Sequence, residues 1–328
     1  MNILVVGGAG YIGSHMVKML LNAGHAVVTM DNLVSGHRDA VVGGEFIHGD
    51  LADLDLLKRL FGSHRFDGVM HFVSHIQVGE SVRVPAMYYQ NNVACTLNLL
   101  DAMLAHEVGN LIFSSTAAIF GEPCYLPIDE THPKAPINPY GRSKLMVEQI
   151  LADYDQAYGL RSICLRYFNA AGADPAGLLG ERHDPETHLI PLMLQVASGR
   201  RDAISVYGRD YATADGTCIR DYIHIMDLCQ GHLLALEQLV SGGGSAAYNL
   251  GNGKGFSVQQ VIDAACDVTG CDIKVIDALR RDGDSAVLVA DSSLAKQMLG
   301  WQPKYTDLET IVTHAWVWEQ RKNEHAAN

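Results

Sequence analysis

A glycine-rich turn follows directly on an apolar run at the N-terminus. The run is Ile3–Val6, the turn has Gly7, Gly10 and Gly13 as Gly-x-x-Gly-x-x-Gly, and a helical pattern covers Gly13–Ala23. A continuous apolar run is typical of a strand in a parallel sheet that is buried on both faces. The glycines permit a tight turn, a close approach of the backbone to a pyrophosphate, and close packing of helix on strand. The pattern predicts a strand–turn–helix unit whose helix N-terminus binds a dinucleotide.

Strands and helices alternate through the first half of the chain. Apolar runs predict strands at Ala26–Met30, Phe46–His48, Gly68–Phe72, Asn110–Ser115 and Ser162–Arg166. Helical patterns predict helices at Leu54–Phe61, Pro85–His106 and Pro139–Tyr158. This alternation is typical of an α/β fold with a doubly wound parallel Rossmann sheet, which binds ligands at the carboxyl ends of its strands.

The chain of 328 residues exceeds a typical single domain, which favours a second, smaller α/β substrate domain. Glycine-rich loops at Gly172–Gly180 and Gly208–Gly216 interrupt the regular alternation. We expect residues 1–170 plus about 218–250 to form the NAD-binding Rossmann domain. Residues 171–217 plus about 251–328 would then form the substrate domain.

Charge and composition narrow the range of partners. The formal net charge of −13 disfavours nucleic acid and anionic membranes as partners. No apolar run reaches the roughly 18 residues that span a bilayer, and the N-terminus lacks the basic region of a signal peptide, so we expect a cytoplasmic protein. The 7 cysteines are scattered without a Cys-x-x-Cys pair, which predicts reduced thiols and no metal site.

Two aspartates follow predicted strands where the adenosine end of a dinucleotide would lie. Asp31 ends the second strand, and a carboxylate there accepts hydrogen bonds from the ribose and repels a 2′-phosphate, which favours NAD over NADP. Asp50 follows the strand Phe46–His48 and is a second candidate. For both residues a plain turn aspartate is the alternative interpretation.

Tyr140 and Lys144 form the only Tyr-x-x-x-Lys pair in the chain. Asn138 can cap a helix and Pro139 suits its first position, so both side chains fall on one helix face. A free tyrosine with a pKa of about 10 is only ~0.1% ionised at pH 7, and a nearby ammonium would stabilise its phenolate. We predict a proton-transfer pair, with a structural tyrosine as the alternative.

Hydroxyl side chains end the strand Asn110–Ser115. Ser114, Ser115 and Thr116 lie at the sheet edge where the nicotinamide is expected. Their hydroxyls can share a proton with a substrate alcohol and Tyr140. Because short polar residues often follow a buried strand, Thr116 alone would not indicate catalysis.

Short motifs are spread over almost the whole chain. They are Gly7–Ser14 (GGAGYIGS), Asp31–Leu33 (DNL), Gly79–Ser81 (GES), Pro139–Gln149 (PYGRSKLMVEQ), Arg166–Asn169 (RYFN), Arg220–His224 (RDYIH) and Tyr248–Gly251 (YNLG). In combination they resemble the UDP-glucose 4-epimerases of the extended short-chain dehydrogenase/reductase superfamily, although each motif also occurs in neighbouring sugar-nucleotide enzymes.

The resemblance implies an isomerase of galactose metabolism that interconverts UDP-galactose and UDP-glucose through a transient 4-keto sugar. Tyr140 as phenolate would take the proton of the sugar 4′-hydroxyl while tightly bound NAD takes the hydride from C4′. The hydride returns to the opposite face after the keto sugar has turned over. Lys144 would lower the pKa of the tyrosine and hold the nicotinamide ribose, and Thr116 would hydrogen-bond the reacting oxygen.

The resemblance also implies two sets of binding residues. The cofactor set is Gly7, Gly10, Tyr11, Ile12, Gly13, Asp31, Asn32, Asp50, Leu51, Phe72, Asn91, Ser114, Tyr140, Lys144 and Tyr167. The UDP-sugar set is Thr116, Tyr140, Asn169, His188, Leu189, Tyr207, Arg220, Arg281, Asp284 and Leu288. The arginines suit a diphosphate because guanidinium groups bind phosphate oxygens in pairs.

Three positions depart from familiar members of this family. Phe120 stands where a Tyr-Gly is usual, so a contact through that hydroxyl is absent. Ile76 occupies a place where some members have a lysine near the dinucleotide. Leu288 lies where a large tyrosine restricts some epimerases to glucose and galactose. Leucine is intermediate in size, so substrate breadth stays open.

Several alternatives remain at this point. A 4,6-dehydratase would need an acid pair after Thr116, where this chain has Ala117 and Ala118. A 4-epimerase acting mainly on UDP-N-acetylglucosamine or a UDP-uronic acid is harder to set aside. A non-catalytic NAD-sensing regulatory protein would be expected to lose Tyr140 or Lys144.

Family members are similar in pairing two helices per subunit, which implies a homodimer. The corresponding helices here, Val93–His106 and the one from Pro139, carry apolar residues that could pack against a twin subunit. These residues are Leu97, Leu100, Leu104, Met146, Ile150 and Tyr154. Burial against the protomer's own sheet would produce the same pattern.

Overall fold

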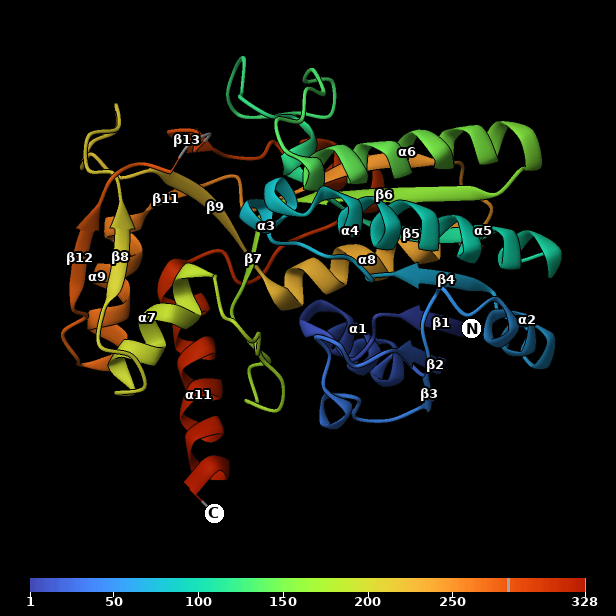
Figure 1. The fold of residues 1–328 in the computed structure, drawn as a ribbon, viewed down its shortest axis with the longest axis horizontal. Helices are drawn as coiled ribbons and strands as arrows, with labels where there is room; N and C mark the ends of the chain where they lie inside the picture. The colour runs from blue at the N-terminus through green and yellow to red at the C-terminus, as the bar shows by residue number, and fades with distance from the viewer. Residues whose placement is uncertain (282–283, 328) are drawn as a thin grey trace.

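Parallel strands form the central sheet of the protein (Figure 1). The computed structural model describes residues 1–281 and 284–327. The sheet has 7 strands in the order β10-β6-β5-β4-β1-β2-β3. They are β1 Asn2–Val6, β2 Ala26–Asp31, β3 Glu45–His48, β4 Gly68–His71, β5 Asn110–Thr116, β6 Arg161–Tyr167 and β10 Ala246–Leu250. Because the order reverses between β1 and β4, a crevice opens there at the carboxyl ends of the strands.

Helices cover both faces of this sheet and explain its continuous apolar strands. The helices α1 (Tyr11–Asn22) and α8 (Ile225–Val240) pack on one face, with Ile3 and Val5 in their core cluster. On the other face, a second cluster contains Leu4 and Val6 of the same strand. The helices of that face are α2 Leu54–Ser63, α5 Cys95–Ala105 and α6 Pro139–Tyr158. Alternate residues of β1 therefore enter opposite cores.

The second lobe contains two small sheets. Its larger sheet is formed by β7 Asn169–Ala171, β9 Ile219–His224, β11 Gly255–Ser257 and β13 Val287–Leu288, and its smaller one by β8 Ile204–Tyr207 and β12 Val275–Ala278. The surrounding helices are α7 Leu189–Ala197, α9 Val258–Thr269 and α11 Leu308–Ala327. Ile190, Val261 and Ile311 join these helices in a separate core. Figure 1 shows α11 extending away from the rest of the molecule.

The expected return of the chain to the central sheet is made by α8 and β10. Within the segment 218–250, β9 instead pairs with β7, β11 and β13 in the second lobe. The helix α10 (Ser293–Leu299) and Trp301 pack beneath α8. Among the described residues, we find no helix that combines the length and apolarity needed to cross a bilayer.

The helix expected over Pro85–His106 is interrupted. The short α4 (Pro85–Tyr89) leads into a π-helical turn, η2 (Gln90–Ala94), before α5 begins. The Asn92 side chain accepts a hydrogen bond from the His75 backbone N–H at 2.9 Å and donates one to the His75 carbonyl at 3.1 Å. These contacts pull the turn toward the segment after β4, where a short helix α3 (Val78–Arg83) also forms. The remaining short turns are η1 Arg38–Ala40 and η3 Ala117–Ile119.

One residue expected on an outward helix face lies elsewhere. Leu100 is fully buried in the core between α5 and the sheet, so it is unavailable to a partner subunit. Met146 on α6 is exposed, whereas Leu97, Leu104, Ile150 and Tyr154 are half-buried. Helical periodicity alone could not distinguish these environments, because α5 is apolar around much of its circumference.

Candidate functional site

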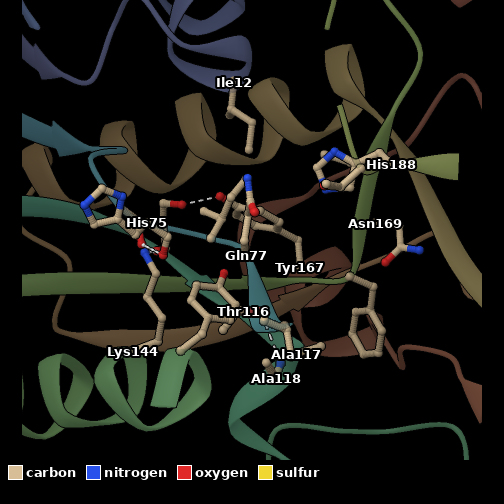
Figure 2. Close-up of a pocket in the computed structure, with 18 of the residues that line it drawn as sticks. Ile12, His75, Gln77, Thr116, Ala117, Ala118, Lys144, Tyr167, Asn169 and His188 are labelled. Atoms are coloured by element: carbon tan, nitrogen blue, oxygen red, sulfur yellow. Dashed lines mark hydrogen bonds between the residues drawn. The ribbon is translucent and has the colours of Figure 1, made fainter. Parts of the chain in front are cut away.

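A cavity of about 470 Å³ lies at the carboxyl ends of the central strands, between the two lobes (Figure 2). Its wall combines residues from both lobes, as Figure 2 shows for Ile12, Thr116 and Lys144 on one side and Asn169 and His188 on the other. The predicted site residues that line it are Gly7, Gly10, Tyr11, Ile12, Gly13, Phe72, Ser114, Thr116, Tyr140, Lys144, Tyr167, Asn169, His188, Asp284 and Leu288.

The glycine-rich turn fits a bound pyrophosphate. A Cβ atom on Gly13 would lie 2.1 Å from the Gly7 carbonyl oxygen, so the turn can close only around glycine there. Gly7 itself has a φ of +80°, a conformation that side chains disfavour. Gly10 is the N-cap of α1, and no side chain caps that helix, so its first N–H groups face the cavity without a side-chain acceptor. An anionic group is what such a helix terminus binds.

The predicted adenosine-binding residues gather at the ends of β2 and β3, outside the cavity wall. Asp31 is buried, and its carboxylate accepts hydrogen bonds from the backbone N–H groups of Ala9 at 3.0 Å and Leu33 at 2.8 Å. Asn32 donates a hydrogen bond to Asp50 at 2.7 Å. Leu51 follows in the core. Asp31 thus ties the glycine-rich turn to the second strand, a role that its position at a strand end did not reveal.

The first turn of α6 places Tyr140 and Lys144 at the cavity. Asn138 caps this helix by accepting a hydrogen bond from the Gly141 N–H at 2.8 Å. Lys144 is 2% exposed, and its ammonium donates a 2.8 Å hydrogen bond to the Ser114 carbonyl. Burial lowers the pKa of Lys144 to about 7. Burial also raises the pKa of Tyr140, while a hydrogen bond with Thr116 opposes that rise.

Hydroxyl groups at the end of β5 surround this pair. The Thr116 hydroxyl accepts a hydrogen bond from the Ala118 N–H at 3.1 Å. The hydroxyls of Ser114 and Tyr167 are hydrogen-bonded to each other, and burial raises the pKa of Tyr167. Tyr140, Thr116, Ser114 and Tyr167 therefore form one polar group against a largely apolar sheet edge.

A buried ion pair beneath this group was missed by the sequence reasoning. Arg166 on β6 donates two hydrogen bonds to Glu148 on α6, at 2.9 and 2.7 Å. The Ser115 hydroxyl donates a third to the same carboxylate at 2.6 Å. The pair locks α6 against β5 and β6, which fixes the helix that carries Tyr140. Both residues fall within quoted motifs, but nothing in the pattern indicated that they meet.

The π-helical turn supports the same helix from another side. Asn92 donates a hydrogen bond to the Ser143 hydroxyl at 3.0 Å, and Ser143 donates one to the Tyr140 carbonyl at 2.7 Å. The predicted cofactor residue Asn91 donates to Asn92 at 2.9 Å and lies outside the cavity wall. His75 and Gln77 line the cavity in the segment that Asn92 holds, and the sequence reasoning did not single them out.

The second lobe closes the cavity with a different set of residues. Arg220 donates a 3.0 Å hydrogen bond to Asp284, which lines the cavity together with Leu288. The Arg281 guanidinium lies 3.9 Å from the centre of the Tyr207 ring. Among the predicted UDP-sugar residues, Leu189, Tyr207, Arg220 and Arg281 lie outside the described cavity wall. Arg220 contacts that wall through Asp284 and through the Ser285 carbonyl, to which it donates a hydrogen bond at 2.8 Å.

Comparison with known proteins agrees with this geometry. The NAD dependent epimerase/dehydratase family matches residues 3–251. A UDP-glucose 4-epimerase of Halalkalibacterium halodurans is 53% identical over 320 residues, 98% of this chain and 96% of that protein. A crystal structure of UDP-glucose 4-epimerase from Brucella ovis in complex with NAD has a TM-score of 0.94 at 50% identity, with coverage of 96% and 97%. The structure of the UDP-Glc/GlcNAc 4-epimerase from Campylobacter jejuni has a TM-score of 0.86 at 45% identity, with coverage of 98% and 99%.

Proposed function

The chain belongs to the NAD dependent epimerase/dehydratase family, and we propose that it is a 4-epimerase that interconverts UDP-galactose and UDP-glucose through a transient 4-keto sugar. The observation that carries the proposal is the position of the first turn of α6. It places Tyr140 in hydrogen-bond contact with Thr116, in the same cavity as the glycine-rich turn. Ala117 and Ala118 line the cavity directly after Thr116. Because methyl groups cannot donate a proton, this wall favours epimerisation over elimination of water.

The resident cofactor of this reaction is NAD. When bound, it would supply a reversible hydride acceptor for C4′ of the sugar, so that no net oxidation results. The glycine-rich turn would hold the pyrophosphate through the N-terminus of α1. Asp31, Asn32, Asp50 and Leu51 would hold the adenosine end, and Tyr11, Ile12, Phe72, Asn91, Ser114 and Tyr167 would complete its surroundings.

Tyr140 would move the proton of the 4′-hydroxyl. Lowering the pKa of a tyrosine from about 10 to about 7 requires roughly 4 kcal/mol of preferential stabilisation of the phenolate. Burial alone acts in the opposite direction here. The ammonium of Lys144 supplies positive charge nearby, and the positive nicotinamide ring adds to it in the holoenzyme. Thr116 would share the proton as a hydrogen-bond partner of the reacting oxygen.

The second lobe would bind the UDP-sugar. Arg220 and Arg281 offer guanidinium groups for the diphosphate. Asp284 holds Arg220 in place at 3.0 Å, and Tyr207 stacks on Arg281. The remaining contacts would come from Asn169, His188, Leu189 and Leu288. Closure of the second lobe over the sugar would also exclude water from the transient keto intermediate.

A direct assay tests this function. The purified protein should convert UDP-galactose to UDP-glucose without added NAD, and denaturation should release about one equivalent of dinucleotide. A non-catalytic NAD sensor would release the dinucleotide but show no turnover. If UDP-galactose is instead oxidised while added NAD is reduced in equal amount, the protein is a dehydrogenase and the proposal is wrong.

A second substrate is favoured by one observation. Leu288 lines the cavity and is half-buried, so it leaves more room than a tyrosine would. The Campylobacter jejuni relative is named for both the Glc and the GlcNAc substrates. We infer that this chain also accepts UDP-N-acetylglucosamine. Comparing kcat/KM for UDP-glucose, UDP-N-acetylglucosamine and UDP-glucuronate would rank the three substrates.

We further propose a cytoplasmic homodimer built on α5 and α6. Figure 1 shows these helices side by side on one face of the sheet. Met146 and Tyr158 of α6 are exposed there, and Tyr154 donates a hydrogen bond to Asp101 of α5 at 3.1 Å. All seven cysteines are free thiols, as expected in a reducing compartment. The two-domain division at about residues 170, 218 and 250 remains part of the same proposal.

A further inference from the structure

A single loop brings two carboxylates and two imidazoles together beside the cavity. Glu181, His183, Glu186 and His188 lie between β7 and α7, and one ligand atom from each lies within 4.8 Å of all the others. The Nδ1 atom of His183 is 3.1 Å from Glu181 Oε1 and 3.6 Å from Glu186 Oε1. Nδ1 of His188 contacts Glu181 and lies 3.6 Å from Glu186 Oε1. The four atoms therefore converge on one point.

Three of these four nitrogen–oxygen separations suit a four-coordinate metal ion, and the direct His188–Glu181 contact would have to widen to admit it. Zn²⁺ binds imidazole nitrogen and carboxylate oxygen at about 2.0–2.2 Å, which puts neighbouring ligand atoms of a tetrahedron roughly 3.3 Å apart. The distances of 3.1 and 3.6 Å around His183 bracket that separation. A set of two nitrogens and two oxygens also favours Zn²⁺ over Mg²⁺ or Ca²⁺, which bind through oxygen.

The burial of the carboxylates points in the same direction. The side chains of Glu181 and Glu186 are each only 5% exposed. Two carboxylates removed from water at such close range need positive charge between them. Protonated imidazoles of His183 and His188 can supply it, and a divalent cation at the same place would supply it with both imidazoles as neutral ligands.

We propose that Glu181, His183, Glu186 and His188 form a structural Zn²⁺ site. The loop that carries them also forms part of the cavity wall through Asp184, Pro185 and Thr187. The ring of His183 meets the ring of Tyr11 edge-on, with centroids 6.5 Å apart. The metal thus holds the loop against the glycine-rich turn and shapes the cavity without contacting the reacting atoms.

Metal analysis of the full chain tests this site. The protein, purified without a metal-binding tag, is treated with a chelator, reloaded with Zn²⁺, washed, and assayed by inductively coupled plasma mass spectrometry. We expect one Zn²⁺ per chain. Reloading should raise Tm by several degrees, because a ligand that binds only the folded state stabilises it. Mg²⁺ at the same concentration should leave Tm unchanged.

Matched variants locate the metal. Glu186→Gln and His183→Asn should each reduce the Zn²⁺ content at least ten-fold and abolish the Zn²⁺-dependent rise in Tm. Glu45→Gln and His64→Asn are the controls, because these two residues form an exposed Glu–His pair at 3.1 Å. Both controls should retain the wild-type Zn²⁺ content.

Substitution with Co²⁺ covers the case in which the loop variants fail to fold. Four-coordinate Co²⁺ absorbs visible light far more strongly than six-coordinate Co²⁺, so the wild-type protein should show the intense spectrum. A wild-type chain that takes up no stoichiometric Zn²⁺, a folded Glu186→Gln variant with wild-type Zn²⁺ content, or a weak six-coordinate Co²⁺ spectrum would each overturn the proposal. The four residues would then form Glu–His ion pairs.

Discussion

Lys144 on α6 and Ser114 on β5 are joined by a 2.8 Å hydrogen bond from the buried ammonium to the backbone carbonyl. The bond ties the first turns of the helix to the end of the strand. Tyr140 and Thr116 are carried by the same two elements, so the distance between their hydroxyls depends on this contact. The helix that begins after Asn138 and the strand that ends at Thr116 thus bring together the two hydroxyls of the proposed proton-transfer site.

Tyr140→Phe should lower kcat by about 10²–10⁴, the usual contribution of an acid–base group, while NAD stays bound. The measurements are the rate of UDP-galactose conversion and the dinucleotide released on denaturation. Tyr158→Phe is the control, because Tyr158 lies on the same helix and is exposed. Wild-type turnover by Tyr140→Phe would show that another group moves the proton.

Lys144→Met should change the pH dependence of stability in the cofactor-free protein. Lys144 has a pKa of about 7 in the folded chain, against 10.5 for an unperturbed lysine, so the unfolded chain binds more protons between these pH values. The wild-type free energy of unfolding therefore rises with pH through that window. At and below pH 7, the free energy of unfolding of the variant should exceed that of the wild type by a few kcal/mol. Loss of the hydrogen bond to Ser114 should reduce this difference by about 1 kcal/mol.

The gain should shrink as pH rises toward 10.5. Urea unfolding of both proteins from about pH 6 to 10 measures it. A difference that stays constant across this range would mean that Lys144 is not desolvated in the folded chain.

Gly13→Ala should prevent retention of NAD. The new Cβ would lie 2.1 Å from the Gly7 carbonyl oxygen, so the turn proposed to hold the pyrophosphate must open. We expect NAD content to fall at least ten-fold and stability to fall by about 1–3 kcal/mol. Gly244→Ala is the control, since no atom lies within 4 Å of its added Cβ. Full NAD content in Gly13→Ala would contradict the assigned role of the turn.

Leu288→Tyr should narrow the substrate range. The larger ring fills cavity space next to the sugar, which costs about 1–3 kcal/mol of transition-state binding for the bulkier N-acetylated substrate. We expect kcat/KM for UDP-N-acetylglucosamine to fall at least ten-fold more than that for UDP-glucose. Leu279→Tyr, at a position 90% exposed, is the control. If kcat/KM falls equally for both substrates, Leu288 does not determine the substrate specificity.

Met146→Arg should dissociate the proposed dimer. A charge placed on the exposed face of α6 would have to be buried between subunits, at a cost of several kcal/mol. Sedimentation velocity should show a monomer for this variant and a dimer for Ile276→Arg, whose site lies on the exposed strand β12. If the wild-type protein sediments as a monomer, or the Met146→Arg variant as a dimer, this face of α6 is not the dimer interface.

Apolar runs and helix-capping residues in the sequence predicted the strands and helix starts on which the candidate site is built. Ile3–Val6 is apolar because both faces of β1 are covered, and Asn138 with Pro139 starts α6 where expected. The family resemblance and the comparisons agree. The roles assigned to individual residues remain predictions.

Contacts between distant segments could not be predicted in this way. Hydrophobic periodicity predicts one continuous helix here. Asn92 instead hydrogen-bonds to the His75 backbone, and the helix contains a π-helical turn at that point. Leu100 faces the protomer's own core because the sheet packs against that side of α5. The periodicity of α5 alone does not indicate on which side the sheet lies. The Glu181–His188 cluster could not be predicted from the cysteine spacing, because its ligands are carboxylates and imidazoles.

The position of β10 has a consequence for synthesis of the protein. β10 pairs with β6 in parallel register, from Ala246 opposite Ile163 to Leu250 opposite Tyr167. A nascent chain therefore emerges from the ribosome with β6 as a bare edge strand until residue 250 follows. Throughout that interval the growing chain exposes unpaired backbone and apolar surface, and chaperones would have the most to bind. Any fragment that stops before Ala246 keeps this exposed edge permanently and should aggregate.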